Sequence, residues 1–99
     1  MHVLIDQSIA KLANMARMDS RVEGLANEIA HKSKNNLLAD GKSSNGLAAA
    51  YMYLSAILLG ANIFQIDLPN LAGVTEVTIR NRCKDILTSF NLTVTVQPM

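Results

Sequence analysis

Apolar residues recur along the first third of this chain at intervals of three and four residues, which is the period of an amphipathic α-helix. The pattern predicts two helices, over about 4–17 and 20–34. Their inward positions are Ile5, Ile9, Leu12, Ala13 and Ala16 in the first, and Val22, Leu25, Ala26, Ile29 and Ala30 in the second. Ser20, followed by Glu23, is typical of a capping box that starts the second helix.

The segment 45–59 is apolar on nearly every side and predicts a third helix. A helix of this kind belongs at the centre of a bundle, where its neighbours cover all of its faces. Gly60 is expected to end it. The apolar run 47–59 is too short to cross a membrane, which takes about 20 residues.

A fourth helix is expected over about 62–72 and a fifth over about 75–90, with an extended tail at 91–99. Pro69 disturbs the fourth, because a proline in mid-helix removes a hydrogen bond and clashes with the preceding turn. We therefore expect either a kink there or a helix that begins later, with Asp67 or Leu68 as its cap.

Composition agrees with a single all-α domain. The chain has 99 residues, of which 49% are hydrophobic and 17% charged, and it contains only two Pro and five Gly. This usage favours one core of four or five helices joined by short connections over a sandwich or barrel.

The stretch 72–82 predicts a DNA-binding helix-turn-helix. Gly73 allows the left-handed backbone of a tight turn, and Thr75 can cap the following helix. Within the fifth helix the apolar residues Ile79, Cys83, Ile86, Leu87 and Phe90 are expected to face the core. The opposite stripe carries Val77, Arg80, Asn81 and Lys84, which is where a recognition helix meets the major groove.

The net charge of the chain bears on a nucleic-acid partner, and the chemistry of its side chains argues against a metal site, a cofactor site and an enzyme. A net charge of only +1 is weak evidence for a nucleic-acid partner, so DNA binding would need a local cationic patch and would be weak and salt-dependent in the isolated domain. The single cysteine, Cys83, is expected in the core, and the sequence predicts no metal site, no cofactor and no enzyme activity. His2 and His31 are expected at the surface. Gly41-Lys42-Ser43 lacks the upstream strand and spaced glycine of a nucleotide-binding loop.

Three segments in this order, Gly41-Lys42-Ser43, the run GLAAAYMYLSAILL and AGVTEVTIRNR, resemble the second cyclin repeat of archaeal transcription initiation factor B, of the general factor IIB family. The resemblance covers roughly residues 8–92. It implies a five-helix cyclin-like domain whose last two helices form the helix-turn-helix. It also implies that the zinc ribbon, the linker and the first repeat of such a factor lie outside this chain, so the chain is expected to be either an excised domain or a short paralogue.

The resemblance also implies which residues meet DNA. In that family the residues matching Val77 and Arg80 read the B recognition element upstream of the TATA box, and Asn81 lies on the same stripe. Physically, valine can contact a thymine methyl and arginine can pair with guanine. Arg82 is turned to the flank and is expected at a phosphate. Phosphate contacts are also expected from Lys42, Ser43, Thr75 and Lys84. For Lys42 and Ser43, ordinary capping of the third helix is an equally good explanation. For the cations of the fifth helix, the alternative is a solvent-exposed helix face without a partner.

The expected partners are promoter double-stranded DNA and TATA-binding protein, with RNA polymerase reached only through parts of the full-length factor. The domain is expected to be a monomer without membrane contact, in the archaeal cytosol and associated with the nucleoid. Two alternatives remain open: a cyclin-like protein-interaction module, which suits the near-neutral charge, and a small stand-alone helix-turn-helix repressor, which would require a dimer.

Overall fold

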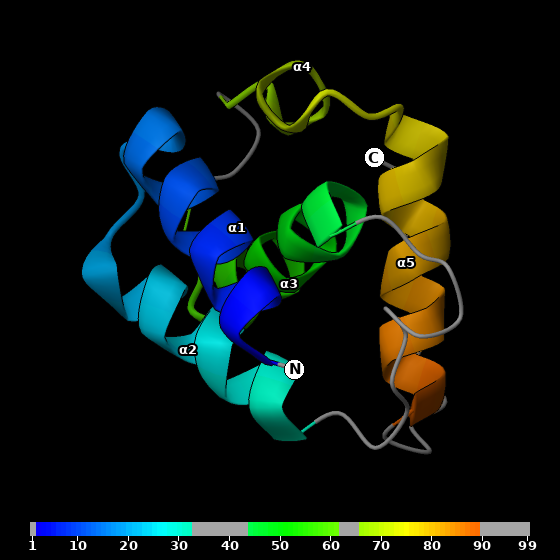
Figure 1. Ribbon diagram of the computed structural model, residues 1–99, viewed down its shortest axis with the longest axis horizontal. Helices are drawn as coiled ribbons and strands as arrows, with labels where there is room; N and C mark the ends of the chain where they lie inside the picture. The colour runs from blue at the N-terminus through cyan, green and yellow to red at the C-terminus, as the bar shows by residue number, and fades with distance from the viewer. Residues whose placement is uncertain (1, 33–43, 62–65, 90–99) are drawn as a thin grey trace.

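The computed structural model describes residues 2–32, 44–61 and 66–89. Over these ranges the chain forms five α-helices and no strand, which confirms the predicted all-α fold. The helices are α1 (His2–Ala16), α2 (Ser20–Lys32), α3 (Ser44–Leu58), α4 (Leu68–Ala72) and α5 (Glu76–Ser89). Helix α3 runs through the middle, with α1 and α2 on one side, α5 on the other and α4 across one end (Figure 1).

The bounds of α1, α3 and α5 lie within two residues of the predicted ranges, a difference of the size expected at helix ends. Helix α4 begins at Leu68, later than the start of the predicted range 62–72, which confirms the second of the two outcomes expected from Pro69. Asp67 is its N-cap and accepts a hydrogen bond from the Asn70 N–H, so Pro69 falls in the first turn. A proline is tolerated there because the N–H that it lacks would have no partner in the helix. Residues 33–34, 62–65 and 90–99 lie outside the described ranges.

The start of α2 corrects the expected capping box. The side chain of Asp19 accepts a hydrogen bond from the Arg21 N–H at 2.8 Å, and the Asp19 carbonyl accepts from the Val22 N–H at 2.9 Å. Asp19 is therefore the cap, and Ser20 is the first helical residue. Asp19 is favoured over Ser20 as the N-cap because aspartate caps a helix as well as serine does and also places a negative charge at the positive end of the helix dipole.

Helix α3 is the core of the domain, as its pattern predicted. Its buried residues are Gly46, Leu47, Ala48, Ala49, Ala50, Tyr51, Met52, Tyr53, Ser55 and Ala56. Ser55, the one buried polar residue here, satisfies its hydroxyl by donating to the Tyr51 carbonyl at 2.7 Å. The expectation of burial to the end of the helix was wrong, because Ile57, Leu58 and Leu59 are exposed.

Helices α1 and α3 end in the same hydrogen-bonded motif, which also closes α4. After α3, the Gly60 N–H donates to the Ile57 carbonyl and the Ala61 N–H donates to the Ala56 carbonyl, with Gly60 at φ +70°. After α1, Arg17 takes the equivalent left-handed position at φ +53°. Glycine adopts this backbone conformation without strain, whereas a residue with a Cβ atom, such as Arg17, is strained by it.

Helices α1 and α2 are also joined at the surface. The Nε2 atom of His31 lies 2.8 Å from Oδ1 of Asp6, and both side chains are partly exposed. The sequence predicted a surface position for His31 but not its contact with Asp6, since the two residues lie far apart in the chain.

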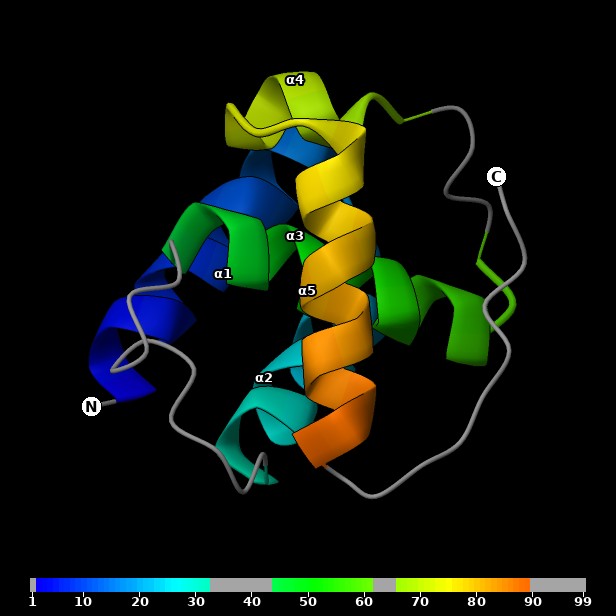
Figure 2. The ribbon, with the colours of Figure 1, turned by 90° about the vertical axis from the view of Figure 1, so that its right-hand side faces the viewer.

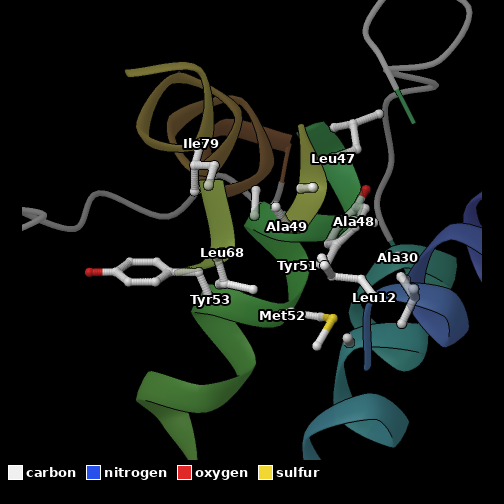
Figure 3. Packing of buried hydrophobic residues seen from close by; sticks show 14 of the residues in the cluster. Leu12, Ala30, Leu47, Ala48, Ala49, Tyr51, Met52, Tyr53, Leu68 and Ile79 are labelled. Carbon is white, nitrogen blue, oxygen red and sulfur yellow. The ribbon is translucent and has the colours of Figure 1, made fainter. Parts of the chain in front are cut away.

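Helix α5 packs mainly against α3, which it crosses in Figure 2. Its buried residues Ile79, Cys83 and Ile86 face α3. In Figure 3, Met52 is directed toward the side of Leu12 and Ala30, while Tyr53 leaves α3 on the opposite side. The central helix α3 therefore contributes buried side chains to its contacts with α1 and α2 and to its contact with α5, and it determines the position of α5. Among the described residues, no helix is long and apolar enough to cross a membrane.

Candidate nucleic-acid interface

The turn between α4 and α5 is closed by hydrogen bonds around Gly73. Gly73 has φ +70° and ψ +32°, its N–H donates to the Asn70 carbonyl, and the Val74 N–H donates to the Pro69 carbonyl at 3.0 Å. An added Cβ at Gly73 would meet no atom within 4 Å, so the requirement for glycine here is one of backbone angle rather than space. The turn residue predicted from the sequence is therefore in the predicted conformation.

The first turn of α5 is capped by Thr75. Its hydroxyl oxygen accepts a hydrogen bond from the Thr78 N–H at 3.1 Å and lies 2.9 Å from the Thr78 hydroxyl. Glu76 follows in the first turn, where its negative charge is favourable at the positive end of the helix dipole. The N-terminus of α5, the end that would enter a groove, is thus held in a defined geometry.

The outward stripe of α5 carries the residues that the sequence assigned to base reading. Val77 is 61% exposed, an unusual position for a branched apolar side chain, and Asn81 and Lys84 are exposed as well. Ile79 and Cys83, in contrast, are almost fully buried. The structure therefore brings Val77, Arg80, Asn81 and Lys84 onto one helix, where Val77, Asn81 and Lys84 are exposed and Arg80 is partly buried.

Arg80 forms an ion pair with Glu76, one turn earlier on α5. The distance from its Nη2 to Oε1 of Glu76 is 3.1 Å, and the two side chains are 40% and 48% exposed. The Nε atom of Arg80 has no hydrogen-bond partner among the described residues. The guanidinium is thus held by one edge. This pair was not predicted, although glutamate four residues before arginine is a recognisable stabilising spacing.

Arg82 is held differently. Its Nε lies 2.9 Å from Oδ2 of Asp85, in an arrangement that does not meet hydrogen-bond geometry, and the Arg82 side chain is only 18% exposed. Arg82 was expected on the flank of the helix at a phosphate. The structure places it half-buried on the flank, where the Asp85 carboxylate lies beside its charge.

The charges of α5 largely compensate one another. The helix carries three cations, Arg80, Arg82 and Lys84, and two carboxylates, Glu76 and Asp85. Since Glu76 and Asp85 pair with the two arginines, Lys84 is the cation of α5 that has no ion pair among the described residues. A surface of this kind attracts DNA weakly over distance, in agreement with the net charge of +1.

Tyr53 lies behind this face and was not singled out from the sequence beyond a place in the core or at its rim. It is buried, and its ring leaves α3 on the side of α5 (Figure 3). Burial raises the pKa of the Tyr53 phenol, the nearby Cys83 and Glu76 raise it further, and the positive charge of Arg80 lowers it.

The remaining predicted contacts are only partly described. Thr75 lies at the N-terminus of α5 beside the turn, whereas Lys42 and Ser43 lie outside the described residues. Among residues 2–32, 44–61 and 66–89, no cluster of three or more histidine, cysteine or acidic side chains could hold a metal ion. Cys83 is buried, and its Sγ lies 3.8 Å from the Ala50 carbonyl oxygen.

Comparison with known proteins gives a consistent result. Residues 5–89 match the model of the transcription factor TFIIB repeat. Over 89 residues, 90% of this chain, the sequence is 39% identical to transcription initiation factor IIB of Pyrobaculum islandicum. The corresponding protein of Saccharolobus shibatae is 35% identical over 89 residues, also 90% of this chain. The chain spans 27% and 29% of the length of these two relatives.

Proposed function

Because this chain belongs to the transcription factor TFIIB repeat family, we propose that it is the DNA-binding second repeat of an archaeal general transcription initiation factor. In this role α5 enters the major groove upstream of the TATA box, and a neighbouring TATA-binding protein supplies the additional affinity. Polymerase is reached through other parts of the longer factor.

The observation that carries the proposal is the presence on α5 of the exposed Val77 and the partly exposed Arg80, just after a turn and a cap that fix the start of the helix. Base edges are reached by side chains near the N-terminus of a recognition helix. Val77 offers methyl groups to a thymine, and Arg80 offers two parallel N–H donors to guanine O6 and N7. Asn81 lies on the same exposed stripe, within reach of a neighbouring base.

Phosphate contacts complete the interface. Lys84 is exposed and unpaired among the described residues, and Thr75 lies at the helix N-terminus, where backbone N–H groups favour an anion. Arg82 reaches a phosphate only if its guanidinium leaves Asp85. Lys42 and Ser43 precede the N-terminus of α3 and are proposed as a second phosphate contact.

The proposal is tested by comparing Arg80→Ala with Arg82→Ala in the complex with TATA-binding protein and a TATA-promoter duplex. Arg80→Ala should weaken binding by about 1–3 kcal/mol and relax the preference at one base pair. Arg82→Ala should weaken binding to all sequences alike and lower the salt slope by about one. Equal, sequence-independent losses would reduce Arg80 to a phosphate contact.

A protein-interaction module is the second candidate. The observation that favours it is the exposed apolar group Ile57, Leu58 and Leu59 at the end of α3, since contiguous exposed apolar side chains mark contact surfaces. No loss of DNA binding from either arginine variant would make this the better assignment. A stable homodimer in solution would instead favour a stand-alone repressor, because palindromic operators require a two-fold dimer.

A further inference from the structure

The ion pair between Glu76 and Arg80 places a negative charge on the face of α5 that is proposed to meet DNA. Both side chains are close to half exposed, and the carboxylate holds the guanidinium through Nη2 at 3.1 Å. A carboxylate at such a surface opposes DNA binding in general, because every phosphate carries the same sign of charge. Its presence beside a base-reading arginine therefore needs a reason beyond affinity.

We propose that Glu76 is a specificity-determining residue, which keeps Arg80 from pairing with phosphates and leaves it available to guanine. This inference rests on the proposed function, since it concerns the same helix and the same arginine. Specificity is a difference between two affinities, and it can be raised by weakening the wrong complex. Glu76 raises specificity by weakening the non-specific complex, in which Arg80 pairs with a phosphate.

The two complexes make different demands on the ion pair. In a non-specific complex Arg80 would turn to a phosphate, so its guanidinium must leave Glu76, and the carboxylate is then left near negative charge without a partner. In the matched complex the guanidinium keeps its contact with Glu76 through Nη2 and presents its other Nη N–H donors to guanine. Only the non-specific complex bears the repulsion in full.

Helix stabilisation alone does not account for the pair. Thr75 already caps the first turn of α5 through the Thr78 N–H, and an exposed pair four residues apart adds little to stability. The Arg82–Asp85 pair on the same helix shows the contrast, because Arg82 is only 18% exposed whereas Arg80 is 40% exposed. The Glu76–Arg80 pair is the more exposed of the two at both residues, since Glu76 is 48% exposed and Asp85 is 34% exposed.

The test measures the affinity of the whole chain, with TATA-binding protein, for two groups of duplexes. One group carries the best-bound sequence upstream of TATA, and the other carries a substitution of the base pair that Arg80→Ala identifies. Glu76→Gln should raise affinity for the substituted duplex about fivefold, the change expected for one unit charge a few ångström from a phosphate in water. Affinity for the matched duplex should change less than about twofold, so the ratio falls.

Glu28 offers a matched control. It forms an ion pair with Lys32 at 2.8 Å with the same spacing of four residues, on α2. Glu28→Gln removes the same charge from the chain and should leave the ratio between the two duplexes unchanged. In the Arg80→Ala background, Glu76→Gln should likewise leave the ratio unchanged, because its target is gone. Thermal unfolding of each variant confirms that the fold is retained.

The outcomes separate this inference from the proposed function. If Arg80→Ala leaves base preference unchanged, the proposed function fails. If Arg80→Ala relaxes the preference but Glu76→Gln raises both affinities equally, the role of Glu76 is overturned and the function stands. A loss confined to the matched duplex would also overturn it, because Glu76 would then contact a base itself.

Discussion

The thiol of Cys83 on α5 lies against the backbone of α3, with its Sγ 3.8 Å from the Ala50 carbonyl oxygen. The Cys83 side chain is buried, and its close approach to α3 is at Ala50. Burial raises the pKa of the Cys83 thiol to about 12, because the thiolate would lose its hydration there. This contact between two helices therefore links stability to alkaline pH.

We expect the free energy of unfolding to fall as pH rises from about 9 to 12. In this pH range the unfolded chain releases the Cys83 proton while the folded chain keeps it, so the unfolded state is stabilised relative to the folded state. The decrease is at most about 1.4 kcal/mol per pH unit from this group. Urea unfolding at several alkaline pH values measures it.

Cys83→Ala is the variant for comparison. It should be less stable at neutral pH, because it leaves a small void between α3 and α5, but its stability should fall less steeply above pH 9. The difference between the two proteins therefore shrinks as pH rises. Parallel pH curves would show that Cys83 does not titrate in this way.

Thr75→Ala should lower stability by about 0.5–2 kcal/mol, because the Thr78 N–H loses its hydrogen-bond partner at the start of α5. Thr75→Ser keeps the hydroxyl oxygen and should restore most of the loss. Thermal or urea unfolding of the three proteins gives the comparison. Equal loss from both substitutions would assign the effect to the threonine methyl group instead of the cap.

Arg17→Gly should raise stability by about 0.5–1 kcal/mol. Arg17 has φ +53° in the position that follows α1, a conformation that strains any residue with a Cβ. The gain is partly offset, because glycine increases the entropy of the unfolded chain.

The matched comparison for Arg17 is Gly60→Ala, at φ +70° after α3. An added Cβ at Gly60 meets no atom within 4 Å, so its expected loss of about 1 kcal/mol comes from the backbone angle alone. If Arg17→Gly fails to stabilise while Gly60→Ala destabilises, the arginine side chain contributes contacts that outweigh its strain.

Pro69→Ala should lower stability by about 0.4–1 kcal/mol. A proline in the interior of a longer helix would give the opposite sign, because alanine would restore a hydrogen bond and remove a clash. In the structure Pro69 lies in the first turn of α4, where its missing N–H is harmless and its ring restricts the unfolded chain. Urea unfolding decides between the two signs.

The sequence was sufficient for features that depend on local pattern. Helix periodicity placed α1, α3 and α5, the apolar run identified α3 as the central helix, and Gly73 marked the turn. These predictions succeed because each rests on neighbours within a few residues. The family resemblance is confirmed, while the DNA-contacting residues that it implied stay proposals.

The features that the sequence did not predict depend on which of two neighbouring residues caps a helix, or on contacts between residues far apart in the chain. The sequence predicted Ser20 as the cap of α2, and the hydrogen bond from the Arg21 N–H to the Asp19 carboxylate identifies Asp19 instead. The contact of Asp6 with His31 joins two helices across 25 positions, which no local pattern reveals. The end of α3 was expected to be covered, and the exposure of Leu58 depends on which helices reach that far.

Since α3 is the main helix on which α5 packs, α5 can detach without disturbing the contacts of α3 with α1 and α2. Such a helix opens as a unit, at a lower free energy than global unfolding. Amides of α5 should therefore exchange with solvent sooner than those of Ala49 to Met52 in the middle of α3, and as a cooperative group. The part of the chain proposed to read DNA would then be the first to unfold, and duplex binding should slow its exchange selectively.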